Sequence, residues 1–380
     1  MLFNLTLNNF SFDKSYKDFS LYSEFINKKI IKKDSVNLIY YKNSNLQKKI
    51  QQNIKKRDLN IQFSNFDFPF TISALNLFLL MIITFLIFFI SLINIFRNKV
   101  EFINFSEEIL KYYILKLSNI KYLPKNIYFN NSSWKYKPLW TYIAEKKGIN
   151  IVVYFYSLSE LEYKNNFDYK ILQGHNSLCW NNYFSWNKEH SNYLKQISKV
   201  TPKIIEKKPF SLRDSDPSIL NNFDFSNTIA IFDAAPYKKI FSDTFAMYSS
   251  EYRCYENVLS FLRDIDYLSN KYNLKIIYKT KKSNKRQISK FFLNHLKKLT
   301  DNPNFMLIND SISPKNYINK CLCSISYPFT STAHFNEDKS KSIYYDPTGN
   351  IYLDDIGAHG INIINDKNKL DSFLYDIISK

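Results

Sequence analysis

Glycine is scarce in this sequence, with five residues among 380. Neither a G-x-G-x-x-G run nor a Walker A sequence occurs. Dinucleotide-binding sites and P-loops need these glycines, because the backbone must come close to the phosphates. The sequence therefore argues against both kinds of site, and any phosphate-bearing ligand must be held in another way.

Cysteine is also rare, and its four positions are Cys179, Cys254, Cys321 and Cys323. They form no disulfide framework and lack the second closely spaced pair that a zinc site requires. We expect Cys321 and Cys323 to be small buried core residues, the compartment to be reducing, and no metal site to be present.

Nucleic-acid motifs are missing although the formal net charge is +18. The lysines are spread along the whole chain instead of being gathered beside a recognisable module. Nucleic acid is therefore not the expected partner. A basic surface of this kind suits anionic lipid headgroups or a phosphorylated substrate.

Charge is absent between Asp67 and Arg97, and residues 68–96 are almost entirely apolar. A helix needs about 20 such residues to span a bilayer, and the run lies too far from residue 1 for an ordinary signal peptide. Residues 67–97 are thus predicted to be a membrane-associated segment, either crossing the bilayer or lying in it. A helix buried in a soluble core is the alternative. Basic residues flank the run on both sides, so charge predicts no orientation.

Outside that run, apolar strands alternate with helical patterns, which predicts parallel α/β sheets. We expect two Rossmann-like domains that face a cleft. Residues 1–66 and 98–200 form the first domain, 201–227 a linker with three prolines, and 228–380 the second. In the second domain, strands are predicted over 228–232, 274–278, 305–308, 322–325, 342–345 and 361–364, and helices over 251–271, 289–299, 314–319 and 367–379.

One segment combines a Pro-Phe pair with three hydroxyl residues, Pro328-Phe-Thr-Ser-Thr332, directly after a predicted strand. Hydroxyls and free backbone N–H groups where a helix begins form an anion site. A Ser/Thr helix cap without a ligand is the alternative. Lys279 and Lys281 follow the strand over 274–278, and ligands in parallel sheets bind at the carboxyl ends of strands. We therefore assign Thr330, Ser331, Thr332, Lys279 and Lys281 to a phosphate.

These residues resemble the bacterial polysaccharide-biosynthesis proteins named for their PFTS motif. The resemblance covers roughly residues 120 to 380. Its pieces are PFTST over 328–332, SIYYDP over 342–347, IAIFDAAP over 229–236, PLWTY over 138–142 and IVVYFYS over 151–157. It implies a glycosyltransferase of the GT-B type, which moves a sugar from a nucleotide donor without a bound metal or other cofactor.

The remaining site assignments follow from position. Tyr345 is expected to stack on the nucleobase and Asp346 to bind a ribose hydroxyl, with Glu337 as another candidate for the ribose. A general base must lie near the acceptor hydroxyl. His175 and Asp233 are the candidates, since each follows a predicted strand.

The expected function is sugar transfer from a nucleotide sugar to a lipid-linked or growing glycan, in the assembly of bacterial surface polysaccharide such as capsule or O-antigen. The expected location is the cytoplasmic face of the cell membrane. Two alternatives stay open: transfer from another nucleotide-activated donor of the CDP-alcohol type, and an inactive membrane scaffold that keeps the fold.

Overall fold

The computed structural model describes two compact units. The first comprises Met1–Tyr154, Ser177–Phe184 and Lys199–Ile205, and the second comprises Phe155–Asn176, Ser185–Ser198 and Glu206–Lys380. The described residues are 37–40, 61–64, 72–97, 99, 102–120, 123, 126–130, 137–155, 157–158, 178–207, 220, 223–234, 236, 254–279, 288–308, 312–328, 330–349 and 351–379. His175 and Lys281 lie outside them.

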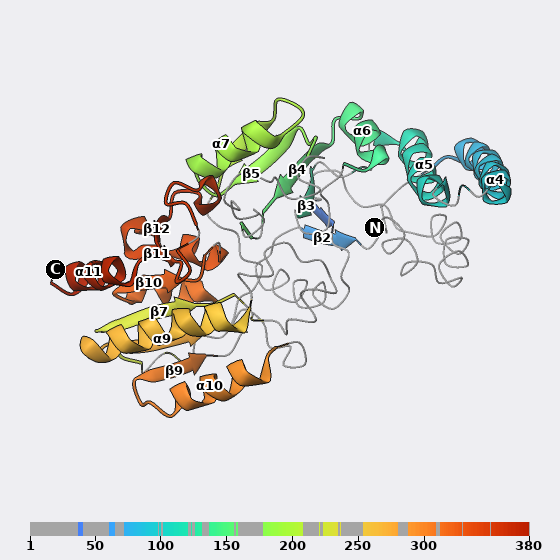
Figure 1. The fold of residues 1–380 in the computed structure, drawn as a ribbon. Helices are drawn as coiled ribbons and strands as arrows, with labels where there is room; N and C mark the ends of the chain where they lie inside the picture. The colour runs from blue at the N-terminus through green and yellow to red at the C-terminus, as the bar shows by residue number, and fades with distance from the viewer. Residues whose placement is uncertain are drawn as a thin grey trace. The chain divides into compact units, whose positions relative to one another are not determined.

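The first sheet has six strands in the order β2-β1-β3-β4-β5-β6 (Figure 1). The pairs from β2 to β5 are parallel. This order begins 2-1-3-4-5, which is one of the two common doubly wound arrangements. The strands are β1 (Asn37–Tyr40), β2 (Ile61–Ser64), β3 (Asn126–Asn130), β4 (Asn150–Tyr154), β5 (Asn182–Ser185) and β6 (Lys203–Glu206).

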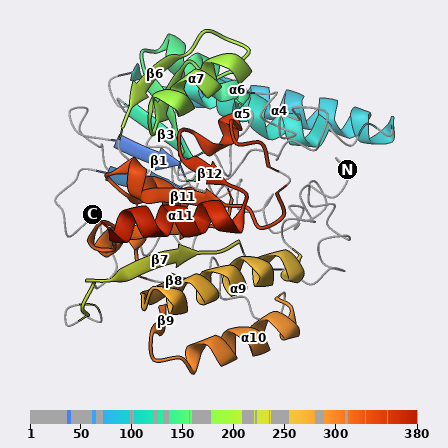
Figure 2. The same cartoon turned by 60° about the vertical axis from the view of Figure 1, so that its left-hand side comes forward.

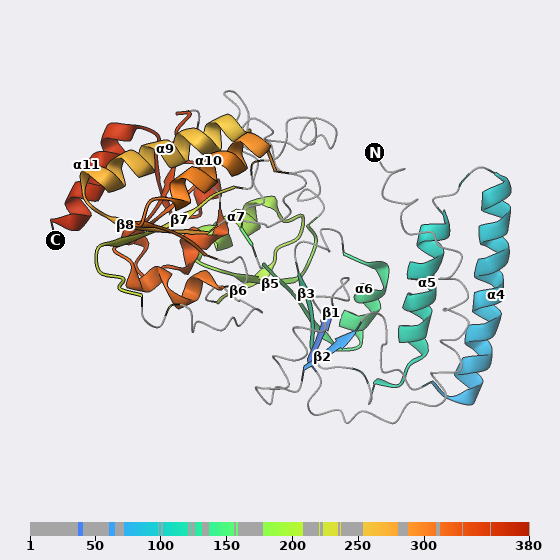
Figure 3. The same ribbon diagram turned by 90° about the horizontal axis from the view of Figure 1, so that it is seen from below.

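Three helices stand side by side next to this sheet, in the order α6, α5, α4 (Figure 3). They are α4 (Ala74–Phe96), α5 (Phe102–Leu117) and α6 (Leu139–Lys146). The Asn76 amide at the start of α4 donates to the carbonyl of Leu117 at the end of α5 over 3.0 Å. The two helices therefore form an antiparallel hairpin.

Residues 139–147 have a helical pattern, and the glycine that follows predicts a helix end at Gly148; helix α6 ends there. This residue has φ +81°, a left-handed conformation that glycine adopts without a Cβ penalty. Its N–H donates to Glu145 O over 2.9 Å, and the N–H of Ile149 donates to Ala144 O over 3.1 Å. Both bonds belong to the Schellman motif, which satisfies the last carbonyls of the helix and turns the chain into β4.

The second sheet has the strand order β12-β11-β10-β7-β8-β9, and all its pairs are parallel. Counted from β7 as the first strand, this is the Rossmann order 3-2-1-4-5-6, whose direction reverses between the first and fourth strands. That reversal lies between β7 and β10. The strands are β7 (Thr228–Phe232), β8 (Lys275–Lys279), β9 (Phe305–Ile308), β10 (Cys323–Ser326), β11 (Ser342–Tyr345) and β12 (Asn362–Ile364).

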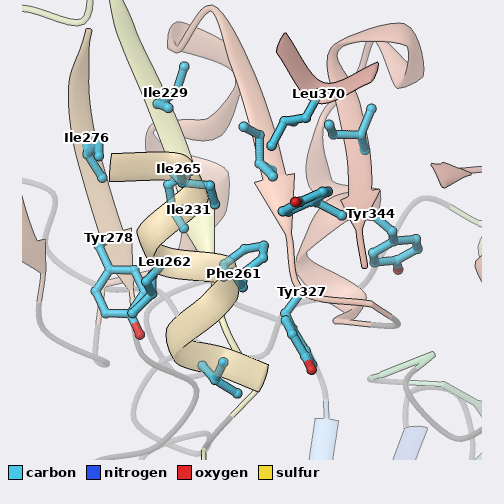
Figure 4. Packing of buried hydrophobic residues seen from close by; sticks show 14 of the residues in the cluster. Ile229, Ile231, Phe261, Leu262, Ile265, Ile276, Tyr278, Tyr327, Tyr344 and Leu370 are labelled. Carbon is cyan, nitrogen blue, oxygen red and sulfur yellow. The ribbon is translucent and has the colours of Figure 1, made fainter. Parts of the chain in front are cut away.

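Three helices pack on one face of the second sheet (Figure 2). They are α9 (Tyr255–Lys271), α10 (Lys290–Thr300) and α11 (Lys367–Ile378). Alternate residues of β7 divide between the faces: Ile229 and Ile231 join the helices, whereas Ala230 and Phe232 join the opposite cluster. Figure 4 shows Phe261, Leu262 and Ile265 of α9 packed against the sheet face that the helices cover. Both faces are covered, as parallel sheets require.

The structure also contains elements that the sequence did not predict. These are α5, β5, α7 (Lys188–Ile197) and β6. Strand β6 lies inside 201–227, the range predicted to be a linker, and the first sheet extends into it. Its four residues, KIIE, are too few to show a pattern that separates a strand from a linker.

Candidate functional site

The candidate site lies where β7 and β10 end, at the reversal of strand order in the second sheet. Ligands of doubly wound sheets bind at such a switch point, outside the carboxyl ends of the strands. In the pairing register, Ser326 of β10 lies beside Phe232 of β7, which lies beside Lys279 of β8. Asp233 directly follows β7, and the PFTST segment follows β10 after Tyr327. Chain segments remote in sequence thus meet at one edge.

The hydroxyl residues were expected to lie where a helix begins, but no α-helix begins there. Residues Ser331–Phe335 form a 3₁₀ helix, η8, of five residues. A second 3₁₀ turn, η9 (Lys339–Lys341), leads into β11. The polar stretch after Thr332 provides no long apolar face to pack, so the helix is not extended. The expected helix N-terminus is therefore wrong, and a phosphate at this place would depend on side chains and loop N–H groups.

The most unusual property of this segment is its set of buried polar atoms without partners. Between Ser326 and Asn336, five buried side-chain atoms have no hydrogen bond to any part of the chain that the structure describes. Most buried polar groups in native proteins are hydrogen-bonded, and an unpaired one costs about 1–3 kcal/mol. A cluster of them is a reason to look for a ligand. The five atoms are Ser326 Oγ, Thr330 Oγ1, Thr332 Oγ1, His334 Nδ1 and Asn336 Nδ2.

Tyr344 connects this segment to β11. Its hydroxyl donates to Thr330 O over 3.0 Å and lies 3.3 Å from His334 Nε2. A phenol has a single proton, so when that proton goes to Thr330 the imidazole must donate through Nε2–H. His334 Nδ1 then carries a lone pair. This assignment gives the segment between Ser326 and Asn336 an acceptor beside its hydroxyl donors.

His334 is 8% exposed, and its pKa lies well below the usual histidine range. Burial is the main cause, since it disfavours the charged ring, and the nearby His359 and Lys339 lower the pKa further. The imidazole is therefore neutral at physiological pH, and its Nδ1 can accept a hydrogen bond.

Aromatic rings and two further histidines of the second unit surround His334. Its ring centroid lies 5.9 Å from that of Trp186 and 6.2 Å from that of His359. The His359 ring in turn lies 5.1 Å from His190 of α7. Ser157 Oγ lies 3.3 Å from Ser331 Oγ. The sequence analysis assigned no role to Ser326, His334 or Asn336, although their nearness to the PFTST segment could have drawn attention to them.

Lys279 and Asp233 are engaged in the structure. The ammonium of Lys279 donates to the carbonyl of Ile312. Asp233 is buried and accepts from the Tyr278 hydroxyl over 2.5 Å. Burial and this carboxylate raise the pKa of Tyr278 well above the usual tyrosine range. Both residues lie at the edge where they were predicted, and their roles toward a ligand stay predictions.

The three residues assigned to a nucleoside lie further along the chain. Tyr345 is 2% exposed, its ring stacks on Phe261 of α9, and its hydroxyl donates to Asp264 over 2.7 Å. Asp346 is fully buried and accepts from Thr348 and the N–H of Ile351, so it holds its own turn. Glu337 is exposed. Contact between these residues and a nucleoside stays a prediction.

Metal ligands do not gather in this part of the chain. Among the described residues, no group of three or more His, Cys, Asp or Glu is placed to hold an ion.

Comparison with known proteins adds one informative match. A family model described as polysaccharide biosynthesis PFTS motif protein matches residues 88–374. A search among curated proteins finds no match.

Solved structures with similar folds include UDP-GlcNAc 2-epimerase from Methanocaldococcus jannaschii, at 11% identity and a TM-score of 0.43, with 91% of this chain and 92% of that chain covered. The same enzyme in complex with UDP-GlcNAc and UDP matches at 12% identity and a TM-score of 0.39, with the same coverage. TM-scores below 0.5 carry no conclusion about this chain.

Proposed function

Since the chain belongs to the family of polysaccharide biosynthesis PFTS motif proteins, whose model matches more than half of it, we propose that it is a glycosyltransferase. It moves a sugar from a nucleotide-sugar donor to a lipid-linked or growing glycan. The observation that carries this proposal is the set of unpartnered polar atoms between Ser326 and Asn336, at the switch point of the second sheet.

The hydroxyls of this segment fit the leaving group of such a reaction. Negative charge develops on the nucleotide phosphate as the bond to the sugar breaks, and donors already in place stabilise that charge. Thr330, Ser331 and Thr332 supply hydroxyl donors, and Lys279 supplies a positive charge on the same edge two strands away. The hydroxyls of Thr330 and Thr332 lack partners among the described residues, so they gain the most from a bound phosphate.

His334 fits a different part of the reaction. Its Nδ1 needs a donor rather than an acceptor, so it suits a hydroxyl of the sugar or of the acceptor. A neutral imidazole at this position can take the proton of the attacking hydroxyl as a general base. We therefore add His334 to the earlier candidates for this role, His175 and Asp233.

We place the reaction at the cytoplasmic face of the cell membrane, where nucleotide sugars and lipid-linked acceptors meet. Helix α4 supports the association with a membrane. Among the described helices it alone is long and apolar enough to cross a membrane, and Leu80 is its only fully buried residue. This exposure argues against the alternative of a helix buried in a soluble core.

Nucleotide binding tests the site directly. Titration of CMP, CDP, UDP and GDP, followed by thermal shift and calorimetry, should identify a nucleotide that stabilises the folded protein. The double variant Ser331→Ala, Thr332→Ala should lower the affinity for that nucleotide by roughly 10- to 100-fold while the protein stays folded. The reason is that hydrogen bonds to a charged phosphate are lost.

Thr300→Val is the matched control, since its hydroxyl is exposed at the end of α10, in the same unit. It should leave nucleotide affinity unchanged. Stabilisation by none of the nucleotides would favour the inactive scaffold. Equal affinity in the double variant and the wild type would remove the phosphate site from the PFTST segment.

A further inference from the structure

The outer surface of α4 is apolar on every side. The helix contains no charged residue, and its exposed side chains include Phe85 at 62% and Phe88 at 59%. Soluble proteins rarely expose such a continuous apolar surface to water. The connection to α5 carries Arg97 and Lys99, both exposed, which suit anionic headgroups. Length, composition and flanking charge all point to lipid as the material that covers this helix.

Strand pairing decides how the helix can meet that lipid. Strand β2 precedes the α4–α5 hairpin and β3 follows it, and both pair with β1 in one sheet. The chain before α4 and the chain after α5 therefore lie on the same side of any membrane. A single crossing by α4 would place β2 and β3 on opposite sides and break the sheet. The α4–α5 hairpin must accordingly cross the bilayer twice or not at all.

Helix α5 cannot supply a second crossing. It has 16 residues, about 24 Å of helix, which is shorter than the hydrocarbon core of about 30 Å. It also carries Glu107, Glu108, Lys111 and Lys116, and each such charge is costly at the bilayer centre.

Contacts with α6 hold α5 within the first unit. Glu108 accepts from the N–H of Leu139 over 3.0 Å, and the Lys147 ammonium donates to Ser118 O over 2.6 Å, just after α5. Entry of α5 into the bilayer would break both contacts. Because α5 stays with α6, the number of crossings is zero.

We propose that α4 lies in the outer part of one leaflet, parallel to the membrane, on the side where the first unit lies. This inference rests on the membrane association proposed above and specifies its form. Helix α5 joins α4 to the protein along its length, and Arg97 and Lys99 reach the headgroups of the same leaflet. The anchor thus holds the protein at the surface without a segment on the far side.

Side-specific labelling of the full-length protein tests this arrangement. Lys99→Cys reports the position of the hairpin connection, and Tyr375→Cys, at an exposed residue of α11, is the matched control for the second unit. A membrane-impermeant maleimide is applied to intact cells and to inverted membrane vesicles. Peptide mass spectrometry separates the new thiols from the four native ones. Both variants should be labelled in inverted vesicles and neither in intact cells.

Labelling of Lys99→Cys in intact cells would show that α4 crosses, and would overturn the proposal. Protection on both sides that only detergent relieves would place the connection inside the bilayer, and would overturn the surface arrangement in favour of a re-entrant one. Recovery of the protein in the soluble fraction, checked before labelling, would instead contradict the membrane association itself. The nucleotide titration is independent of all three outcomes.

Flotation with vesicles that contain anionic lipid gives a second test. Phe85→Glu with Phe89→Glu changes two exposed rings of α4 and should lower vesicle binding by roughly 10-fold or more, since large apolar side chains lose their burial in lipid. Tyr375→Glu should leave binding unchanged. Equal binding of both variants and the wild type would exclude α4 as the lipid contact.

Discussion

At the scale of single residues, the central observation is which atoms of Tyr344 and His334 carry the protons of their hydrogen bonds. Tyr344 has one hydroxyl proton, and its geometry gives that proton to Thr330 O. His334 must then donate from Nε2 if its 3.3 Å contact with Tyr344 is a hydrogen bond, so Nδ1 remains an acceptor. A histidine held neutral, with Nε2 as the donor and Nδ1 unpartnered, presents a hydrogen-bond acceptor to a ligand hydroxyl.

The depressed pKa of His334 predicts how stability changes with pH. In the unfolded chain a histidine takes up its proton near pH 6.5, whereas folded His334 resists protonation to a lower pH. Between these two pKa values the unfolded state binds more protons, so stability must fall as the pH falls below about 6.5. The slope from this residue is at most about 1.4 kcal/mol per pH unit.

Urea unfolding of wild type and His334→Gln between pH 7.5 and pH 5, which bracket the histidine pKa of about 6.5, measures this effect. The wild type should lose more stability than the variant over that interval. Parallel loss in both proteins would show that His334 titrates as it does in the unfolded chain.

The same scale shows what sequence position alone cannot give. Tyr345 and Asp346 were assigned to a nucleoside because they end a strand at the binding edge. In the structure Tyr345 packs on Phe261 in the core, and Asp346 holds its own turn. A strand end fixes where the backbone lies, but the direction of a side chain depends on neighbours that come from other parts of the chain.

At the scale of elements, the end of a helix could be predicted from the sequence where it depends on residues next to each other in the chain. Gly148 is such a case, because its left-handed φ of +81° closes α6. A Cβ at this position would meet no atom within 4 Å, so a substitution is costly through backbone strain alone.

Gly148→Ala should therefore destabilise the first unit by about 1 kcal/mol, the typical cost of a left-handed conformation for a residue with a Cβ. Urea unfolding followed by tryptophan fluorescence measures it, since Trp140 and Trp180 are buried in that unit. Lys146→Ala, an exposed residue in the last turn of α6, is the control and should have little effect. A Gly148→Ala protein as stable as the control would show that the chain relaxes to another turn.

Element type was harder to predict where the segment is short. Residues 314–319 and the residues after Thr330 were expected to be helical, and the structure has 3₁₀ turns there. Three to five residues cannot display a helical period, so hydrogen bonding to neighbouring segments decides between the two geometries.

At the scale of the whole molecule, the nucleotide site and the lipid contact belong to different units. The polar segment 326–336 is in the second unit, and α4 is in the first. Replacing residues 74–96 with a short Gly/Ser linker should therefore move the protein to the soluble fraction while nucleotide affinity stays within about twofold of wild type, as expected for sites that share no residues or partners. Fractionation and calorimetry measure the two properties.

Loss of nucleotide binding in this folded deletion protein would show that the anchor and the site are coupled. Circular dichroism and a retained unfolding transition would first establish that the deletion protein is folded. Aggregation of the deletion protein would indicate that α4 covers a face of the first unit instead of contacting lipid.

Sequence alone determined the local order of this protein: the alternation of strands and helices after residue 228, the apolar helix, and the family through its PFTST segment. These features depend on residues that are close in the chain, where periodicity and turn chemistry act. Tertiary structure decided which strands lie together. Only the pairing of β10 with β7 shows that Asp233 and the PFTST segment share one edge, and only the pairing of β2 and β3 with β1 restricts how α4 can meet a membrane. Such pairing joins residues far apart in sequence, and no local pattern encodes it.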